Sequence, residues 1–422
     1  MKSDAAGLQN LFRRALEEGW IVIAANVYTP EYFTGVARAM YESRSPAIVQ
    51  ASSDTLPRLS QIYSGVIVSE IPSVNDLLRG ATRLSEQRKA LEIEAAEEGE
   101  RGRLEIYLAV DHSDPLNKIF LGDEADLAQY RELISGKPQE KIFDQLEQEL
   151  QRLHRDEKKS FDAIFTLKGQ KTPLTIGEVR NLISKYLLFT ESVIMQGEAV
   201  EEGIAVDFDY VALDFSFPQR LNVVLSNVVT ATRDYYAQNG KYVLIESGYG
   251  IETEKDSLRV EEQRQYARRV IQYVADTNID AVSCNIGTYH GEMGKGGKRL
   301  GNLHTTLMED VRQGMKEMRR DNVIIVAHGG SSIADSCLRE LDIARLGLVK
   351  INKASIYISR FAQEIKDYVG SPEVFAAGRF KRGPAKGFNI ADRAIEGVKE
   401  ESLRLFEYCG SSGRTVDVLG SQ

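Results

Sequence analysis

The sequence has few of the features that mark several classes of protein. Its 422 residues include only three cysteines, Cys284, Cys337 and Cys409, and none of them belongs to a CxxC or CxxH pair. This spacing excludes a zinc-finger motif and a disulfide framework, and it favours reduced thiols in a cytoplasmic protein. No apolar run approaches the roughly 20 residues that a membrane-spanning helix needs. We therefore expect a cytoplasmic protein with no membrane partner.

Positive charge is also scarce. The net charge is −9 and no stretch is dense in lysine or arginine, which argues against a nucleic-acid partner. Residues 1–20 have the pattern of a charged amphipathic helix and lack the apolar core of a signal peptide. One face of this expected helix carries Leu8, Leu11, Phe12, Ala15 and Leu16. With 42% apolar residues, the chain has ample material for a folded core.

Eight short apolar runs alternate with helical patterns along the chain. They lie at residues 21–26, 46–52, 104–110, 210–214, 242–246, 280–287, 323–330 and 348–352. Continuous apolar strands separated by amphipathic helices indicate a parallel sheet that is covered on both faces. Eight such strands in succession predict an α/β fold of the (β/α)8 TIM-barrel type.

The connection between the third and fourth runs is longer than a βα unit requires. It is charged and helical in pattern, and Thr175 with Glu178 predicts a capping box. We expect a barrel formed by 1–112 and 206–370, a helical insertion at 113–205 between strands three and four, and extra C-terminal helices at 371–422. A solvated appendage, a lid and an oligomer contact are all open roles for the insertion.

Polar side chains gather where the apolar runs end, and in a TIM barrel the chemistry collects at the carboxyl ends of the strands. The residues at or just past these ends are Asn26, Ser52, Asp111, His112, Asp214, Glu246, His290, His328 and Asn352. Three imidazoles from three different strands suit a catalytic zinc ion with one open coordination position. Three histidines with unrelated roles are the alternative interpretation, and His304 is the fallback ligand.

Glycines lie beside two of these histidines. Gly291 follows His290, and Gly329, Gly330 and Ser331 follow His328. Glycine lets the backbone approach a ligand closely, and N–H groups with a hydroxyl at a helix start form a phosphate cradle. A tight turn without a ligand is the alternative.

Together these residues resemble the class II, metal-dependent fructose-bisphosphate (ketose-bisphosphate) aldolases. The resemblance runs from about Ala15 to Ser355 and is interrupted by the insertion. The matching segments, in the family's order, are Gly19-Trp20 through Asn26-Val27, Ser45-Pro46 through Gln50, Asp111-His112, Glu246 with Gly248, Gly287-Thr288 with His290-Gly291, His328-Gly329-Gly330-Ser331, and Lys350-Ile351-Asn352.

The resemblance implies a reaction of glycolysis, the reversible cleavage of a ketose bisphosphate. Fructose 1,6-bisphosphate would be the default substrate, with dihydroxyacetone phosphate and glyceraldehyde 3-phosphate as products. Zinc or another divalent ion would be held by His112, His290 and His328. Glu246 and Asp214 match carboxylates that face a second or alternative metal position, and a monovalent cation is a further candidate cofactor.

Roles for other residues follow from the same resemblance. Asp111 matches the acid/base at the hydroxyl beside the broken bond, and Glu254 matches a mobile-loop glutamate that moves the carbon-bound proton. The positions that match phosphate-binding and substrate-binding residues are Asn26, Ser52, Gly291, Gly329, Ser331, Asn352 and Ser355. The resemblance also implies a homo-oligomer, a dimer or higher, that acts on a small sugar phosphate.

The chain departs from the family pattern in two places that concern the substrate. Ile251-Glu252 replaces a double glycine, so Glu252 is an alternative to Glu254 as the loop base. Ser371-Pro372-Glu373 stands where family members commonly have aspartate-proline-arginine, whose arginine reaches a second phosphate. A glutamate there repels a phosphate, unless Arg379 or Arg382 substitutes.

Two other functions therefore stay open at this point. One is a related class II aldolase with a different aldehyde half or a monophosphate substrate. The other is a non-catalytic barrel that binds sugar phosphate and works through its inserted helices. The retained Asp111 and three histidines speak against the second, because a binding protein needs no acid/base.

Overall fold

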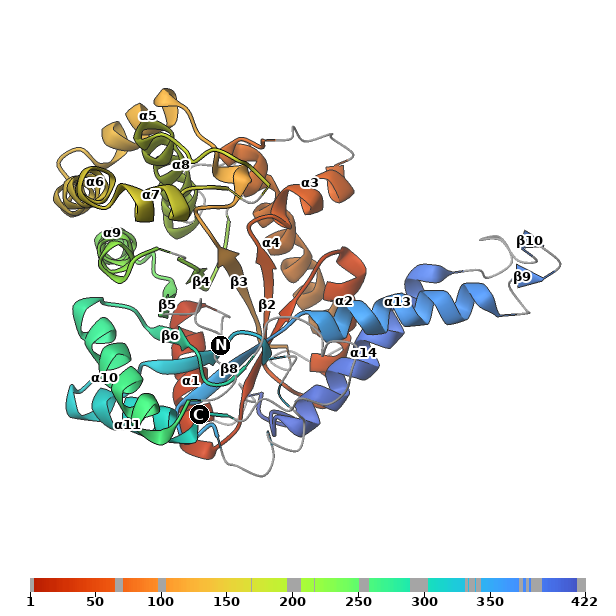
Figure 1. The fold of residues 1–422 in the computed structure, drawn as a ribbon. Helices are drawn as coiled ribbons and strands as arrows, with labels where there is room; N and C mark the ends of the chain where they lie inside the picture. Colours follow the sequence, from red (N-terminus) through yellow and green to blue (C-terminus); the bar gives the residue numbers. More distant parts are fainter. Residues whose placement is uncertain are drawn as a thin grey trace.

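The computed structural model describes residues 4–64, 71–97, 104–167, 169–195, 206–215, 217–249, 258–288, 303–330, 333, 338, 343–371, 375–376, 379–380 and 389–415. Eight parallel strands close into a barrel in sequence order, which confirms the predicted TIM barrel (Figure 1). The strands are β1 (Val22–Asn26), β2 (Ala47–Ser52), β3 (Ile106–Ser113), β4 (Tyr210–Leu213), β5 (Leu244–Tyr249), β6 (Ala281–Cys284), β7 (Ile324–Ala327) and β8 (Leu348–Lys353).

The third strand is longer than its apolar run. The apolar run ends at Val110, but β3 continues to Ser113, so Asp111 lies within the strand. Asp111 pairs in register with Ser52 of β2, and an irregularity in the pairing with β4 falls between Val110 and Ser113. The apolar pattern missed this end because the inward-facing residue there is a hydrogen-bonded carboxylate.

A helix closes the amino-terminal end of the barrel interior. Helix α1 (Ala5–Glu18) buries the five apolar residues that the sequence placed on one face. They form one cluster with the inward residues of the strands, among them Ala24, Tyr107, Ala109 and Val326. The amino-terminal half of the barrel interior is therefore an apolar core. Polar side chains gather in the half at the carboxyl ends of the strands.

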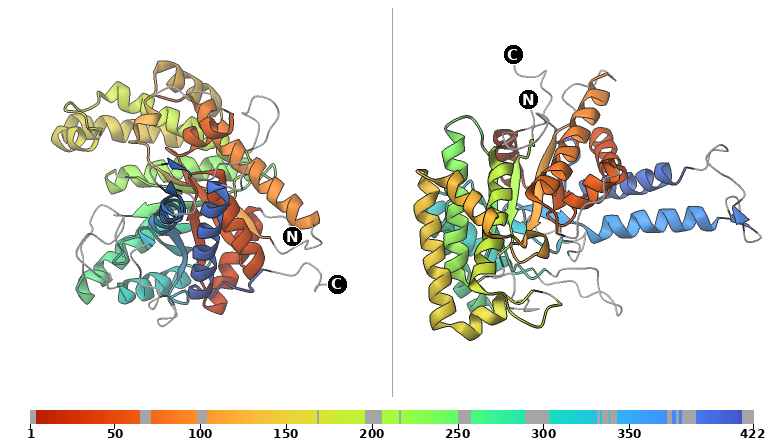
Figure 2. Two further views of the ribbon diagram at one scale, coloured as in Figure 1. Left: turned by 90° about the vertical axis from the view of Figure 1, so that its right-hand side faces the viewer. Right: turned by 90° about the horizontal axis from the view of Figure 1, so that it is seen from above.

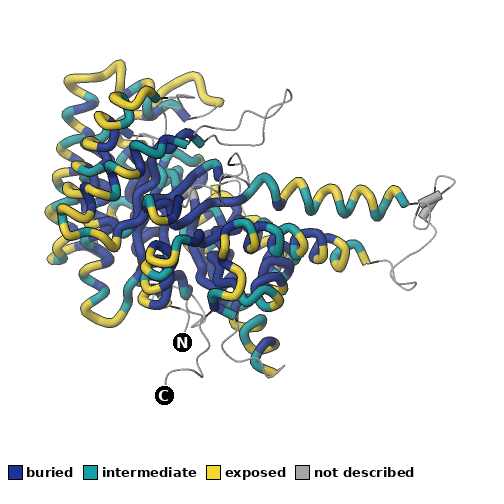
Figure 3. The backbone as a smooth tube through the Cα atoms, turned by 90° about the horizontal axis from the view of Figure 1, so that it is seen from below, coloured by how far each residue is buried: buried dark blue, intermediate teal, exposed yellow. Residues whose placement is uncertain are grey.

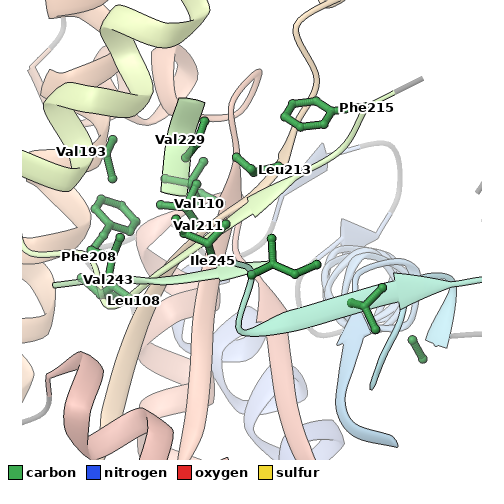
Figure 4. Packing of buried hydrophobic residues seen from close by; sticks show 14 of the residues in the cluster. Leu108, Val110, Val193, Phe208, Val211, Leu213, Phe215, Val229, Val243 and Ile245 are labelled. Atoms are coloured by element: carbon green, nitrogen blue, oxygen red, sulfur yellow. The ribbon is translucent and has the colours of Figure 1, made fainter. Parts of the chain in front are cut away.

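A second apolar core lies between the strands and the surrounding helices. Its outer layer includes α2 (Pro30–Ser43), α3 (Leu56–Ser64), α4 (Val74–Glu97), α9 (Gln219–Ala237), α10 (Val260–Asp276) and α11 (Thr305–Glu317) (Figure 2). Figure 4 shows outward residues of β3, β4 and β5 packing against side chains of two helices. Examples are Val110, Val211 and Ile245 with Val193 and Val229.

The long connection between β3 and β4 consists of packed helices. These are η1 (Lys118–Phe120), α5 (Glu124–Ile134), α6 (Pro138–Asp156), α7 (Lys158–Ile164) and α8 (Ile176–Met195). The predicted capping box is present at α8, where Thr175 N donates to Glu178 Oε2 over 2.7 Å and Glu178 N donates to Thr175 Oγ1 over 3.3 Å. The charged helix α6 buries an apolar face and packs along α9.

The C-terminal helices form an arm that projects from the barrel (Figures 2 and 3). Helix α13 (Ser355–Gly370) pairs with α14 (Ile390–Tyr408), and α14 also packs along α2. The short strands β9 (Phe375–Ala376) and β10 (Arg379–Phe380) pair at the far end. Within the described ranges, none of the helices has the length and apolarity required to span a bilayer.

Candidate active site

A ring of polar side chains lies at the carboxyl end of the barrel interior. Asn26 of β1 and Asp111 of β3 follow an inward apolar residue by two positions, so they point to the same face of the strand, and His328 directly after β7 has the same spacing from Val326. The members are Asn26, Gln50, Asp111, Glu246, His328, Lys350 and Asn352, and each is less than 10% exposed. Burial of so many polar groups is tolerated only where they bind one another or a ligand.

Two amides hold the carboxylate of Asp111. Asn26 Nδ2 donates to Asp111 Oδ2 over 2.7 Å, and Asn352 Nδ2 donates to Asp111 Oδ1 over 2.9 Å. Gln50 Nε2 in turn donates to Asn26 Oδ1 over 2.8 Å, which fixes the orientation of that amide. Both oxygens of Asp111 therefore accept hydrogen bonds from amides, which hold the side chain in one orientation.

Glu246 forms the centre of the other half of the ring. Its Oε1 lies 2.5 Å from His328 Nε2, and its Oε2 accepts hydrogen bonds from Tyr210 Oη and Lys350 Nζ at 2.5 and 3.0 Å. Burial alone would raise the pKa of Glu246, but the charges of Lys350 and His328 outweigh it and lower this pKa to about 2. Burial, with the neighbouring Glu246 charge, raises the pKa of Tyr210 well above its usual value. The Glu246 side chain is therefore an anion and the phenol a neutral donor.

Lys350 joins the two halves. Its Nζ also donates to Asn352 Oδ1 over 2.7 Å, so hydrogen bonds run from Gln50 through Asp111 to His328. Asn352 faces Ala24 of β1 in the register of β8 with β1, where the barrel closes. Barrel closure therefore brings Asn352 to Asp111, although 241 positions separate them in the sequence.

The start of the loop after β7 packs closely against β8 and is tied to the loop after β6. Gly329 has a φ of +68°, which favours glycine. A Cβ at Gly330 would lie 2.2 Å from Ile351 Cγ2 and 2.7 Å from the Asn352 carbonyl oxygen, so a side chain there would displace β8. Thr288 Oγ1 donates to the His328 carbonyl oxygen over 2.6 Å and ties the two loops together.

Three of the predicted site residues lie at the mouth but outside this network. Ser52 is half-buried at the end of β2, and its Oγ donates to Asp54 Oδ1 over 2.5 Å. Asp214 is half-buried directly after β4, and Ser355 is the first residue of α13. All three follow or end a barrel strand, which agrees with a role at the opening.

The fallback ligand His304 has a structural role. Its Nδ1 lies 3.2 Å from the Asn285 carbonyl oxygen, and its Nε2 accepts a hydrogen bond from Leu258 N over 3.3 Å. Backbone groups therefore engage both ring nitrogens of His304. The imidazole instead holds together the segments before α10 and α11.

Part of the predicted site lies outside the residues that the structure describes. This holds for His290, Gly291, Glu252, Glu254, Ser331, Glu373 and Arg382, and for the side chains of His112 and Arg379. Among the described side chains, no three potential metal ligands of the His, Cys, Asp and Glu types form a group. The predicted histidine tripod therefore remains a prediction.

Sequence reasoning gave no role to two members of this ring, Lys350 and Gln50, or to Tyr210, which donates to Glu246. Lys350 and Gln50 belong to segments that carry the family resemblance, and Tyr210 begins the fourth apolar run. The available signal was their spacing: Lys350 and Asn352 are two apart on one strand, so both face the interior. A lysine within an apolar run therefore indicates a site residue that faces the barrel interior.

Comparison with known proteins supports one family. The family model described as fructose-bisphosphate aldolase class-II matches residues 6–128 and 197–414, and the break between these segments falls on the inserted helices. None of the curated proteins matches the sequence.

Several solved structures share the fold. The YdjI aldolase from Escherichia coli K12 is 14% identical and covers 97% of this chain and 98% of its own, with a TM-score of 0.52. The fructose-bisphosphate aldolase from Campylobacter jejuni is 14% identical, covers 97% and 95%, and has a TM-score of 0.58. A putative fructose-1,6-bisphosphate aldolase from Coccidioides immitis is 13% identical, covers 98% and 99%, and has a TM-score of 0.55. At this identity the likeness shows the fold alone.

Proposed function

Because the chain belongs to the class II fructose-bisphosphate aldolase family, we propose that it catalyses the zinc-dependent, reversible cleavage of a ketose bisphosphate. Fructose 1,6-bisphosphate is the default substrate, and the products are dihydroxyacetone phosphate and glyceraldehyde 3-phosphate. The observation that carries the proposal is the Asp111 carboxylate, fully buried at the barrel mouth and held by two amides.

Asp111 is suited to take the proton from the substrate hydroxyl beside the bond that breaks. Both of its oxygens are oriented by Asn26 and Asn352, so the group needs no rearrangement to act as a base. Asn352 also accepts a hydrogen bond from Lys350, which fixes the amide that holds Asp111 and would contact the triose half of the substrate. In the cleavage direction Asp111 accepts the hydroxyl proton, and in the condensation direction it returns it.

The described part of the predicted metal set fits a divalent ion. His328 is buried and its Nε2 meets the Glu246 carboxylate, and a carboxylate behind an imidazole is the usual arrangement around metal-binding histidines. His112, His290 and His328 would hold the ion, and Asp214 would face a second or alternative position. When bound, the ion supplies the Lewis acidity that polarises the substrate oxygens.

The carbon-bound proton requires a second base. Glu254 is our proposal for this group, with Glu252 as the alternative, and both belong to a segment outside the described residues. Gly291, Gly329, Ser331 and Ser355 are proposed to bind the phosphate of the triose half.

The aldehyde half of the substrate is where the sequence departs from the family pattern. Glu373 occupies the position of the family arginine that reaches a second phosphate, and a carboxylate repels that group. This substitution favours the second candidate, a class II aldolase with an unphosphorylated or differently substituted aldehyde.

We also propose a cytoplasmic homo-oligomer. Only Tyr357 is buried among the 16 residues of α13, and Ile358 is 42% exposed on the projecting arm. Burial of the arm against a second copy would cover this face, and light scattering on the purified protein measures the resulting mass.

The test of the proposed function is cleavage of fructose 1,6-bisphosphate with trapping of dihydroxyacetone phosphate. We expect turnover that vanishes with EDTA and returns with zinc. Turnover that EDTA does not affect would refute the metal-dependent mechanism. If zinc binds but this substrate is not cleaved, the same assay with other aldehydes and dihydroxyacetone phosphate, run in the condensation direction, identifies the second candidate.

A further inference from the structure

The inserted helices form a pocket with the start of α4. Its volume is about 550 Å³, which lies within the range of small-molecule sites. One wall consists of residues 71–76, and the other comes from the segment before α5, from α5 and from α8. Helix α8 lies outside the family match, and the pocket shares no residue with the polar ring at the barrel mouth. The pocket is therefore separate from the candidate active site and depends on the insertion.

Both walls are fixed by hydrogen bonds and close packing. Ser73 N donates to Asp76 Oδ2 over 2.9 Å and Asp76 N donates to Ser73 Oγ over 3.2 Å, which forms a capping box on α4. Asp76 Oδ1 also accepts from Arg79 over 3.2 Å, and this ion pair offsets its charge. On the other side, a Cβ at Gly122 would lie 2.5 Å from the Asn181 carbonyl oxygen, so the chain before α5 lies directly on α8. The pocket is therefore largely formed by the fold itself.

Lys185 of α8 brings a buried positive charge to this pocket. It is 5% exposed, and with the buried residues Leu188 and Ser192 it forms the floor. Its Nζ donates to the Leu121 carbonyl oxygen over 3.1 Å, and among the described residues it makes no other hydrogen bond and no ion pair. An ammonium group has three N–H donors, and a buried one without a carboxylate partner is costly. The floor therefore favours an anionic group of a ligand.

Two carboxylates, those of Asp123 and Asp126, carry the opposite charge in the same pocket. Asp123 is exposed and Asp126 is half-buried, so this negative charge lies toward the opening. Asp123 Oδ1 accepts from two backbone N–H groups and Asp126 Oδ2 accepts from one, but within the described part of the chain their other oxygens accept no hydrogen bond. Burial lowers the pKa of Lys185 and the charges of Asp126 and Asp123 oppose this shift, so the three groups lie close enough to act on one ligand.

We propose that this pocket binds a free amino acid, whose carboxylate meets Lys185 and whose ammonium group faces Asp123 and Asp126. The charges of an α-amino acid match those of the pocket in sign and in order from floor to opening. A phosphate or a dicarboxylate would meet repulsion at the opening, and a simple amine would leave Lys185 without a partner. Pro72 and Leu188 also line the pocket, which favours an apolar side chain. This binding site is additional to the proposed aldolase reaction.

The experiment measures binding by the purified chain and does not depend on turnover. The common L-amino acids are screened singly at millimolar concentration for a rise in melting temperature, and the strongest is titrated by calorimetry. We expect leucine, isoleucine, valine or methionine to bind at one site per chain. Analogues of this amino acid that lack either the ammonium or the carboxylate group should bind about 10- to 100-fold more weakly, because each loses a charged hydrogen bond. No binding by any amino acid, or equal binding of either analogue, would overturn the inference.

Variants locate the site. Lys185→Met removes the positive charge and keeps a long side chain, so affinity should fall by about 10- to 100-fold. Lys316→Met, at an exposed lysine of α11, is the matched control and should bind as wild type does. Asp123→Asn combined with Asp126→Asn keeps oxygens that can cap α5, and it should weaken binding of the amino acid more than binding of the analogue without an ammonium group. Wild-type affinity in folded Lys185→Met would overturn the inference.

Asn75→Trp provides a second test if Lys185→Met fails to fold. Asn75 is exposed and lines the pocket, so an indole there should block the ligand while the core packing stays intact. Gln313→Trp, at an exposed position of α11, is the control for adding a surface indole. Unchanged binding by Asn75→Trp would place the ligand outside the pocket and overturn the inference.

Discussion

The barrel interior and the inserted helices use buried space in different ways. At the carboxyl end of the barrel, seven polar side chains share one hydrogen-bonded network around Asp111 and Glu246. The helices between β3 and β4 bury aromatic rings, which include Phe120, Tyr130, Phe143, Phe161, Phe165, Tyr186 and Phe189. Apolar burial contributes about 25 cal/mol per Å², whereas buried charges offset their desolvation only through their partners.

This difference indicates that the barrel interior serves activity and the inserted helices serve stability. The polar ring adds little net stability, and its value lies in holding groups in reactive positions. The inserted helices stabilise the side of the barrel that they cover, because their rings pack against one another and, through Phe217, against the segment that leads into α9. Substitutions in the two regions should therefore separate activity from stability.

The largest effect is expected for Asp111→Asn. The amide cannot accept a proton, so kcat for cleavage should fall by about 10²- to 10⁴-fold. One hydrogen bond from Asn26 or Asn352 is also lost, which lowers the unfolding free energy by roughly 1–3 kcal/mol. Steady-state kinetics and urea unfolding of the same preparation measure both changes.

Asp276→Asn is the control, because Asp276 is an exposed carboxylate on α10, away from the barrel mouth. It should leave kcat unchanged. If Asp111→Asn kept wild-type turnover, Asp111 would not be the acid/base. The polar ring would then not be the region that serves activity.

The second prediction concerns stability alone. Phe161→Ala removes a ring that is 0% exposed and lies 4.7 Å, between centroids, from Phe165. The cavity should lower the unfolding free energy by about 3–5 kcal/mol. The kcat of the folded protein should stay close to that of wild type, since Phe161 belongs to α7 and not to the barrel network.

Lys159→Ala provides a neighbouring exposed control on the same helix and should change stability by less than about 0.5 kcal/mol. A large fall in kcat for folded Phe161→Ala would contradict the view that the packed rings of the inserted helices serve stability alone. It would indicate instead that the inserted helices act as a lid over the site.

Much of the fold could be predicted because its signals are local. Each barrel strand begins with apolar residues, and the face of α1 follows from five residues at helical spacing. Asp111, His328 and Asn352 were identifiable because strand ends and family segments coincide there. The boundary of β3 was missed because its last residues are polar.

The contact between Lys350 and Glu246 could not be predicted, for a physical reason. A lysine in an apolar run has no visible partner in the sequence, and 104 positions separate Lys350 from Glu246. Only the closed barrel shows that Lys350 faces inward, between Glu246 and Asn352. The packing of the inserted helices was equally hidden, since the charged residues of α6 conceal a buried face formed by Phe143, Leu146 and Leu150.

The smallest effect is expected at Glu191, where the inserted helices bury a charged group as the barrel interior does. Glu191 of α8 is 1% exposed and accepts from Tyr236 Oη of α9 over 3.0 Å, while Lys137 Nζ lies 3.6 Å away. Burial raises the pKa of Glu191 above the usual 4.5, although Lys137 opposes the shift. A carboxyl group whose pKa is raised in the folded state costs stability as it ionises, so the cost grows as the pH rises above 4.5.

Glu191→Gln removes this cost and keeps an oxygen that can accept from Tyr236. Relative to wild type, its unfolding free energy should therefore increase with pH between about pH 4 and pH 8, and the two proteins should be closest in stability at the acid end. Glu132→Gln, an exposed change on α5, should give a curve parallel to wild type. Parallel curves for Glu191→Gln as well would mean that Lys137 fully compensates the buried charge. The inserted helices would then tolerate a buried ion pair as well as the barrel does.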